Sequence, residues 1–403
     1  MHSHSQNRVW RACAPAVIAA LLLFQAGPLP AQVRSGAVEG SITATYQSQR
    51  IAVECADADV GALARKAFNA HGDYTVDASG ALRVRLVKTG PATLALTLDV
   101  DGVRFAQNVS GATLEEATLR ACDAVLVRRG QRPLFAGRLV FVSDRTGRKE
   151  IYTGDLFFEK VRPLTQYNSI TVTPRWTHDG AEVLYTTYAN NNFTDIYAVD
   201  PATGRRRNVV VNARGTTTGA VSNPRTGQIA FASSGRGNMD IYLANADGTG
   251  VRALIATSNV ESDPAWSADG SQLAFAGGGT GRPGIHVATP PNGAARRIPT
   301  GYNYATEPAW NPVEKTLLAF TYQAGGFGLA TVDVPTGKLA KINTTGHYMQ
   351  PVWCADGRHL VATQIQGQRT RLVLMDTRKN RKITPLSGTQ MANCSEADYL
   401  PAK

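Results

Sequence analysis

The sequence is short of charged, aromatic and cysteine residues, and these shortages exclude several classes of protein. Of its 403 residues, 18% are charged, 7% are aromatic and five are cysteine. After the first thirty residues no apolar run reaches the length of a membrane span, so we expect none in the mature chain. The net charge of +11 is scattered, with no dense basic tail, which disfavours nucleic-acid binding. Its 38 glycines and 20 prolines are typical of a turn-rich β protein.

The usual catalytic motifs are also missing. The sequence has no H-x-x-x-H, H-E-x-x-H, C-x-x-C or G-x-S-x-G. Five histidines follow the N-terminal segment, and none has an evident partner in the sequence: His71, His178, His286, His347 and His359. We therefore predict a protein that is not an enzyme and needs no cofactor or metal. A metal site assembled from several repeats stays open.

The first 31 residues are typical of a secretory signal peptide. Arg8 and Arg11 precede a short apolar stretch that runs from Ala12 to Phe24, and Gly27-Pro28 breaks it. We predict that residues 1–31 are cleaved on export. Four cysteines would remain in the mature chain, and the hypothesis is that Cys55 bonds to Cys122 and Cys354 to Cys394, with four free thiols as the open alternative.

A repeat of about 44 residues dominates the chain from residue 137 onward. The motif P-x-W ends at Trp176, Trp266, Trp310 and Trp353, at intervals of 90, 44 and 43 residues. The first interval is twice the period, and its missing position falls at Val221. A degenerate copy falls at Cys394, which makes six copies.

Each copy contains short β-branched and aromatic runs separated by Asp-Gly and Thr-Gly turns. Four such strands at this period form one blade of a β-propeller, and the tryptophans should pack between blades. The first copy lacks its innermost strand. We expect residues 391–397 to pair with Arg138–Ser143 and close the ring.

Residues 33–130 carry no repeat and alternate between strand and helix patterns. Strands are expected over 40–53, 82–87 and 92–100, and helices over 59–70 and 114–128, the second with a capping box at Thr113 and Glu116. The predicted fold is thus an all-β six-bladed propeller over 137–400, preceded by a small α/β domain and a linker at 131–136.

The order of an α/β domain and six P-x-W repeats resembles the TolB family of Tol–Pal system proteins. The stretch from Arg129 to Val142 is similar to the family's domain junction. The resemblance implies a non-enzymatic periplasmic adaptor, without a membrane span and monomeric. It implies a Pal-like peptidoglycan-associated lipoprotein as a partner of the propeller, and a TolA-like protein as a partner of the mature N-terminus around Val33 to Gln49.

The loops before the P-x-W motifs should converge on the propeller axis and form a mouth. We predict that a partner protein binds this mouth, and the candidate residues are Thr217, Glu261, Ser262, Thr306, Glu307, Tyr348 and Met349. Two other functions stay open. One is an exported carbohydrate-active enzyme similar to oligogalacturonate lyases, and the other is a propeller that binds glycans or peptides.

Overall fold

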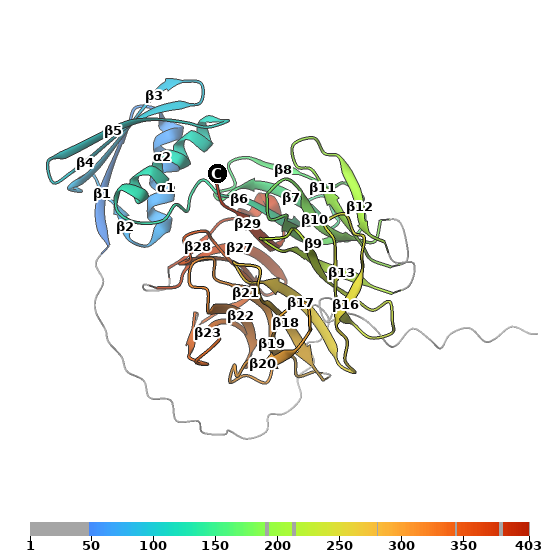
Figure 1. Ribbon diagram of the computed structural model, residues 1–403. Helices are drawn as coiled ribbons and strands as arrows, with labels where there is room; N and C mark the ends of the chain where they lie inside the picture. The colour runs from blue at the N-terminus through green and yellow to red at the C-terminus, as the bar shows by residue number, and fades with distance from the viewer. Residues whose placement is uncertain are drawn as a thin grey trace, which may run out of the picture. The chain divides into compact units, whose positions relative to one another are not determined.

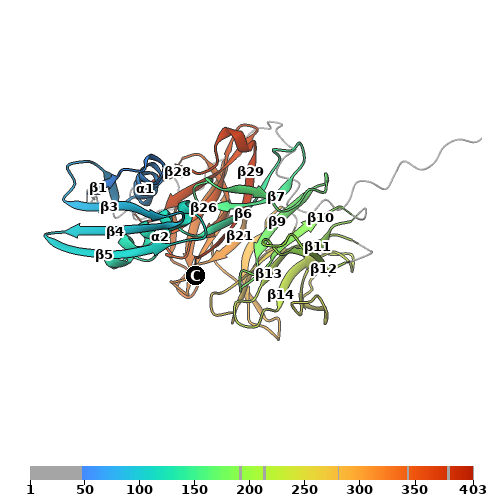
Figure 2. The ribbon, with the colours of Figure 1, turned by 90° about the horizontal axis from the view of Figure 1, so that it is seen from above.

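The computed structural model describes residues 48–189, 193–211, 215–279, 281–342, 345–378 and 382–402. These residues form a small α/β domain and six four-stranded sheets, which Figures 1 and 2 show in two perpendicular views. The predicted signal peptide and the expected start of the first strand lie outside the described residues. Among the described residues, no helix has the length and apolar character needed to cross a membrane.

The small domain is a five-stranded sheet with two helices. Its sheet order is β2-β1-β3-β4-β5. Its elements are β1 (Gln49–Cys55), α1 (Ala58–His71), β2 (Tyr74–Val76), β3 (Leu82–Gly90), β4 (Thr93–Val100), β5 (Val103–Ser110) and α2 (Leu114–Arg128). The structure confirms both predicted helices, and it adds β2 and β5, which the alternation pattern had not indicated.

Local sequence explains where the helices begin and end. The Asp57 side chain accepts a hydrogen bond from the Val60 amide and starts α1, while Gly72 ends it in a left-handed conformation. The hydroxyl of Thr113 accepts from the Glu116 amide at 3.2 Å and starts α2. The Glu116 carboxylate accepts a hydrogen bond from the Ala112 amide at 3.0 Å. In the predicted capping box the donor would be the amide of Thr113, one residue later.

The remaining strands form six blades that follow one another in the chain. Blade 1 contains β29 (Cys394–Leu400), β6 (Arg138–Ser143), β7 (Glu150–Asp155) and β8 (Val161–Pro163). Blade 2 contains β9 (Thr171–Trp176), β10 (Val183–Thr187), β11 (Asp195–Val199) and β12 (Arg206–Val210). Blade 3 contains β13 (Thr217–Ser222), β14 (Ile229–Ser233), β15 (Asp240–Ala244) and β16 (Arg252–Ile255).

The other three blades repeat this pattern. Blade 4 contains β17 (Val260–Trp266), β18 (Leu273–Gly278), β19 (Gly284–Ala288) and β20 (Ala295–Arg297). Blade 5 contains β21 (Ala305–Trp310), β22 (Leu317–Gln323), β23 (Phe327–Asp333) and β24 (Leu339–Lys341). Blade 6 contains β25 (His347–Trp353), β26 (His359–Gln366), β27 (Arg369–Asp376) and β28 (Ile383–Pro385), and a short 3-10 turn, η2 (Thr389–Met391), leads to β29.

The C-terminal strand closes the ring, as predicted. Strand β29 pairs antiparallel with β6, and Cys394 lies opposite Ser143 while Leu400 lies opposite Arg138. The strand that pairs with β6 is Cys394–Leu400, three residues later in the sequence than the expected range 391–397. The innermost strands β9, β13, β17, β21, β25 and β29 each contact the next one around the axis. Closure therefore covers the inner edge of β6, which would otherwise be unpaired.

The tryptophans of the repeat pack between blades, which confirms their predicted role. Trp176, Trp310 and Trp353 are buried, and Trp266 is partly buried. The indole of Trp310 donates to the carbonyl of Ala265, one blade earlier, at 3.1 Å. Trp353 repeats this contact with Ala309 at 3.0 Å. The indoles of Trp310 and Trp353 thus each join two neighbouring innermost strands.

Strand register corrects two assignments within the repeat. Trp176 and Trp266 lie opposite the first residue of the next strand, and Ser222 holds the same place opposite Ile229. Ser222, rather than Val221, is therefore the missing tryptophan position. In the last copy Tyr399 lies opposite Leu139 and takes that position, so the assignment to Cys394 is wrong by five residues.

The same register explains why the expected disulfide bonds are absent. All four cysteines in the described residues are free thiols. Cys394 begins its innermost strand, while Cys354 directly follows the end of β25, so the two lie at opposite ends of the propeller. Cys122 is a buried residue of α2, and Cys55 is only partly buried at the end of β1. The hypothesis for Cys354 and Cys394 was wrong because it placed Cys394 at the tryptophan position, and the pair Cys55–Cys122 is not formed either.

Candidate functional site

The propeller has two ends, and the small domain covers part of only one. The innermost strands begin at the mouth and run to the opposite end, where the Asp-Gly turns lie. The small domain contacts this opposite end near blades 1 and 6, beside β28 in both views (Figures 1 and 2). Lys66 of α1, for example, donates to the Phe157 carbonyl at 2.9 Å. The hydrogen bonds between the described residues of the two domains all lie at this opposite end, as do those of Arg358 and His359.

A belt of six residues surrounds the axis below the mouth. Each belongs to one innermost strand, lies at its β-bulge and has a left-handed φ between 51° and 69°. The belt consists of Thr173, Gly219, Asp263, Glu307, Gln350 and Glu396. A non-glycine residue rarely adopts such a φ, so the bulge must be held by contacts on both sides.

Side chains of the belt hold the backbone of the next blade. The Glu307 carboxylate accepts from the Gln350 amide at 2.8 Å, and the Gln350 side chain accepts from the Glu396 amide at 3.2 Å. Glu396 in turn accepts from the Thr173 amide at 2.7 Å. Each contact supplies an acceptor to a backbone donor that the bulge leaves without a ladder partner. The belt therefore links four consecutive blades.

The belt is acidic, and its acids share a confined space. Burial, and next the charge of Asp263, raise the pKa of Glu307 to about 7. Burial also raises the pKa of Asp263 above its usual range, against the opposing effect of Arg175. Arg175 donates to the carbonyl of Pro174 at 3.0 Å and lies close to the belt. The axis beneath the mouth thus has a negative potential that favours cationic groups.

The predicted binding residues lie at the mouth ends of the innermost strands, but most of their side chains are buried. Thr217, Glu261, Thr306 and Tyr348 are less than a tenth exposed, and Ser262, Glu307 and Met349 are partly exposed. Tyr348 accepts a hydrogen bond from the Gln364 amide group at 2.8 Å, and Thr217 bonds to Ser233 at 3.1 Å. These contacts support the ends of the blades, which leaves Ser262 and Met349 as the better-placed contact residues.

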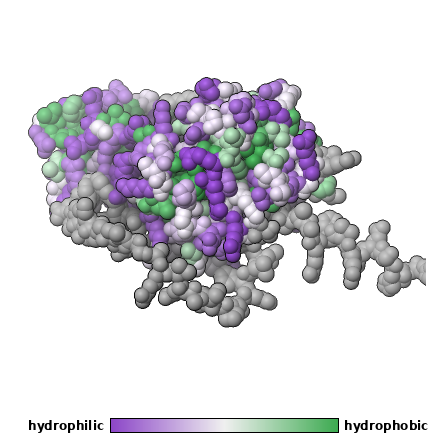
Figure 3. All heavy atoms as spheres, turned by 60° about the horizontal axis from the view of Figure 1, so that its bottom comes forward, coloured by the Kyte–Doolittle hydropathy of each residue, from purple (hydrophilic) through white to green (hydrophobic). Residues whose placement is uncertain are grey.

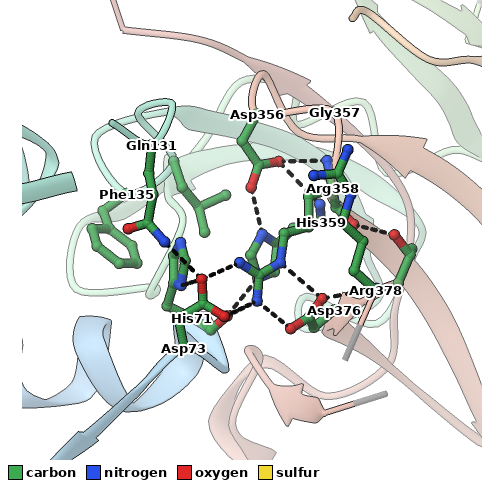
Figure 4. A network of polar contacts seen from close by, with 12 residues as sticks. His71, Asp73, Gln131, Phe135, Asp356, Gly357, Arg358, His359, Asp376 and Arg378 are labelled. Carbon is green, nitrogen blue, oxygen red and sulfur yellow. Dashed lines mark hydrogen bonds and ion pairs between the residues drawn. The ribbon is translucent and has the colours of Figure 1, made fainter. Parts of the chain in front are cut away.

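A second polar network joins the two domains at the end opposite the mouth (Figure 4). Arg358, which follows the Asp356-Gly357 turn of blade 6, donates to both carboxylate oxygens of Asp73 at 2.6 and 2.8 Å. The same guanidinium donates to Asp376 at 2.9 and 2.5 Å. All three side chains are buried, so a single arginine is shared by one acid from each domain.

His359 strengthens this network beside the arginine. Its Nδ1 lies 2.5 Å from the Asp356 carboxylate, and its Nε2 lies 2.9 Å from the His71 carbonyl. Although burial opposes it, the hydrogen bond and charge of His359 hold the pKa of Asp356 below its usual value. The Asp356 carboxylate and the His71 carbonyl can only accept a hydrogen bond, so both ring nitrogens of His359 are engaged in this contact between the domains.

This cluster is the one group of three or more His, Cys, Asp or Glu residues among the described residues whose ligand atoms could hold a metal ion together. His71, Asp356 and His359 offer atoms within 4.8 Å of one another. However, both ring nitrogens of His359 already contact hydrogen-bond acceptors, which leaves neither of them free to bind a metal. Burial, followed by the charges of His359 and Arg358, lowers the pKa of His71 to about 3. The cluster therefore fits a domain contact better than a metal centre.

The other histidines do not join it. His178 bonds to Ser222 at 3.1 Å, His286 to the Gly284 carbonyl at 3.0 Å, and His347 accepts from the Phe327 amide at 3.3 Å. These three contacts belong to separate blades. The structure thus offers no shared geometry in which these three rings could act as a catalytic group.

Sequence reasoning missed both the belt and the domain contact. The sequence carries a weak signal for the belt. The residue directly before the P-x-W motif, or before the three residues that replace this motif, is polar in five of the six copies. The signal for the contact was the pair of large basic residues at Arg358 and His359, where other Asp-Gly turns are followed by residues such as Ala181 and Ser271.

Comparison with known proteins places the chain in a family. The TolB beta propeller domain family matches residues 128–395. A TolB homolog of Chlorobaculum tepidum is 38% identical over 148 residues, which are 35% of this chain and 33% of the relative. The Tol-Pal system protein TolB of Anaeromyxobacter sp. (strain K) is 29% identical over 206 residues, 47% of this chain and 45% of the relative. The matches thus span less than half the length of these relatives.

A solved structure shows the same architecture. The crystal structure of TolB from Acinetobacter baumannii superimposes with a TM-score of 0.76, and the match covers 88% of this chain and 97% of that one. At 17% identity this likeness establishes the fold, a six-bladed propeller with a small α/β domain before it. Together with the match over residues 128–395, it shows that the chain belongs to the TolB beta propeller domain family.

Proposed function

We propose that the protein is a non-enzymatic adaptor of the Tol–Pal type that acts in the periplasm, where its propeller mouth binds a Pal-like lipoprotein. The observation that carries this proposal is the placement of the small domain at the opposite end of the propeller, so that the described part of this domain does not cover the mouth. Relatives named Tol-Pal system protein TolB support the assignment to this system.

Exposed apolar side chains around the mouth support a protein partner. Ile170, Phe193, Val211 and Val260 are each more than two fifths exposed, and all lie in loops or strand ends at this end of blades 2 to 4. On the face shown in Figure 3, hydrophobic side chains form small areas separated by hydrophilic ones. Scattered apolar contacts around a polar centre are typical of a reversible protein interface.

The acidic belt adds an electrostatic contribution. Asp263, Glu307 and Glu396 lie on the axis below these apolar residues, with Arg175 as the nearby cation. A partner that brings basic or hydrogen-bond donor groups to the axis would be attracted by this potential. The proposed interface thus combines an apolar rim with an acidic centre.

A TolA-like protein is the proposed partner of the mature N-terminus. This part of the proposal rests on family resemblance, because the stretch around residues 33–47 lies outside the described residues. Cleavage of residues 1–31 on export would expose that stretch. The proposed role is to connect the two partners and so maintain the envelope during cell division.

Capture of the lipoprotein by purified variants tests the mouth. Val260→Arg and Met349→Arg place a charge at the rim, and each should weaken capture of the organism's own Pal-like lipoprotein by about 1–3 kcal/mol. Leu339→Arg is the matched control, because Leu339 is as exposed as Val260 but begins β24 at the opposite end. Thr306→Arg is unsuitable, since Thr306 is buried. Equal capture by all three variants would exclude the mouth as the binding site.

A further inference from the structure

Two buried carboxylates at the mouth each have one oxygen without a hydrogen-bond partner among the described residues. Asp240 begins β15 of blade 3, and Glu261 lies near the start of β17 of blade 4. Their side chains are almost fully buried, and Asp240 Oδ1 and Glu261 Oε2 have no partner in the structure. Buried polar atoms in native proteins are paired with protein groups, water or an ion, so each exception requires an explanation.

The backbone brings the two acids together. The Glu261 amide donates to the carbonyl of Met239, the residue before Asp240, at 2.8 Å. Burial raises the pKa of Glu261, and the nearby charge of Asp240 raises it further. Burial likewise raises the pKa of Asp240, while Arg236 acts in the opposite direction. The hydroxyl of Thr257 donates to Glu261 Oε1 at 2.6 Å, which leaves Oε2 without a donor.

Other blades satisfy the same two positions with neutral or bonded groups. The residues equivalent to Glu261 in blades 2 and 3 are Thr171 and Thr217, which bond to hydroxyls on the neighbouring strand at 3.1 Å each. In blade 4 the neighbouring residue is Gly277, which has no side chain. Gly277 thus leaves space for the Glu261 side chain but offers it no side-chain hydrogen bond from the neighbouring strand.

The position of Asp240 shows the same contrast. Its counterpart in blade 1 is Glu150, where one carboxylate oxygen accepts from Thr165 at 2.5 Å and the other from the Asn168 amide at 2.7 Å. Asp240 has no such donors for Oδ1. Blades 3 and 4 are therefore the place where two acids meet, each with one unpaired oxygen.

We propose that Asp240 and Glu261 bind a divalent cation of the calcium class between blades 3 and 4. Two carboxylates supply the hard oxygen ligands that Ca²⁺ prefers, and water would complete its flexible coordination. The ion would neutralise both charges and join two blades at the rim of the mouth. This site is separate from the belt on the axis. The proposed ion binding does not depend on whether the mouth binds a lipoprotein.

Thermal unfolding of the full chain after treatment with EDTA tests the site. Extracellular calcium sites bind with dissociation constants on the order of 0.1–1 mM, so 10 mM CaCl2 should raise Tm by about 2–5 °C. NaCl at the same ionic strength is the control for screening. An equal rise with NaCl, or no rise with CaCl2, would overturn the proposal.

Three variants locate the response. Glu261→Thr introduces the residue that blades 2 and 3 carry, and Asp240→Asn removes the second charge; both should abolish the rise in Tm. In EDTA, Glu261→Thr should be at least as stable as the wild type, because it removes an uncompensated buried charge. Glu150→Gln, at the counterpart of Asp240, should keep the full calcium response. A response that persists in both Glu261→Thr and Asp240→Asn would place the ion elsewhere and contradict the proposal.

Discussion

The carboxylate of Glu396 accepts a hydrogen bond from the Thr173 amide at 2.7 Å, although 223 positions separate the two residues in the sequence. Glu396 lies in the C-terminal strand of blade 1, and Thr173 lies in the first strand of blade 2. The contact continues the belt across the point where the ring closes. The last strand of the chain is thus part of both the first blade and the axial belt.

Removal of this strand should end cooperative unfolding. Deletion of residues 394–403 removes the pairing of β29 with β6 and exposes the inner edge of β6. We expect a broad thermal transition by circular dichroism and a lower calorimetric enthalpy. Deletion of residues 401–403 alone is the control and should leave the transition sharp. An unchanged transition in the longer deletion would contradict closure by β29.

Loss of the arginine between the domains should be costly. Arg358→Met leaves Asp73 and Asp376 buried without their shared cation, and we expect a loss of about 3–5 kcal/mol in the free energy of unfolding. Arg378→Met is the matched control, because Arg378 pairs with Glu314 in an exposed position. That variant should lose at most about 1 kcal/mol in the same urea titration. Similar losses in both variants would mean that the buried pair does not hold the domains together.

The belt should make stability depend on pH through Glu307. Its pKa rises from 4.5 to about 7 in the folded protein, so the stability linked to its proton is present below pH 4.5 and is lost as pH rises through 7. Glu307→Gln keeps the acceptor without the charge. We expect this variant to be more stable than wild type by about 1–2 kcal/mol at pH 8, and equal to it near pH 4.

Urea titrations of both proteins at several pH values between 4 and 8 measure this difference. Comparison at each pH removes the contribution of the other titrating groups, since the two proteins share them. A stability difference that stays constant across this range would show that Glu307 does not carry the raised pKa.

The repeat made most of the propeller predictable from sequence. Trp310 and its counterparts mark the innermost strands, and the Asp-Gly turns mark the opposite end, because both features recur at the blade period in several copies. The closing strand was also predictable, since the first copy lacked an inner strand. Assignment of the tryptophan position in degenerate copies failed at Ser222 and Tyr399, because both copies lack the proline and the tryptophan of the P-x-W motif.

The site was much less predictable. The belt residues share a left-handed backbone rather than a residue type, and a mixture of Thr, Gly, Asp, Glu and Gln hides that property in the sequence. Arg358 and Asp73 lie 285 positions apart, and the repeat pattern carries no information on a contact between domains. Burial of Thr217, Thr306 and Tyr348 also follows from neighbouring blades, which a single repeat does not reveal.

Isothermal titration of the purified mature protein with the soluble domain of the organism's own Pal-like lipoprotein tests the central claim most directly. The adaptor proposal predicts saturable binding with one lipoprotein per propeller, weakened roughly tenfold or more by Val260→Arg and unchanged by Leu339→Arg. Absence of binding by the correctly folded wild-type protein would contradict the proposal.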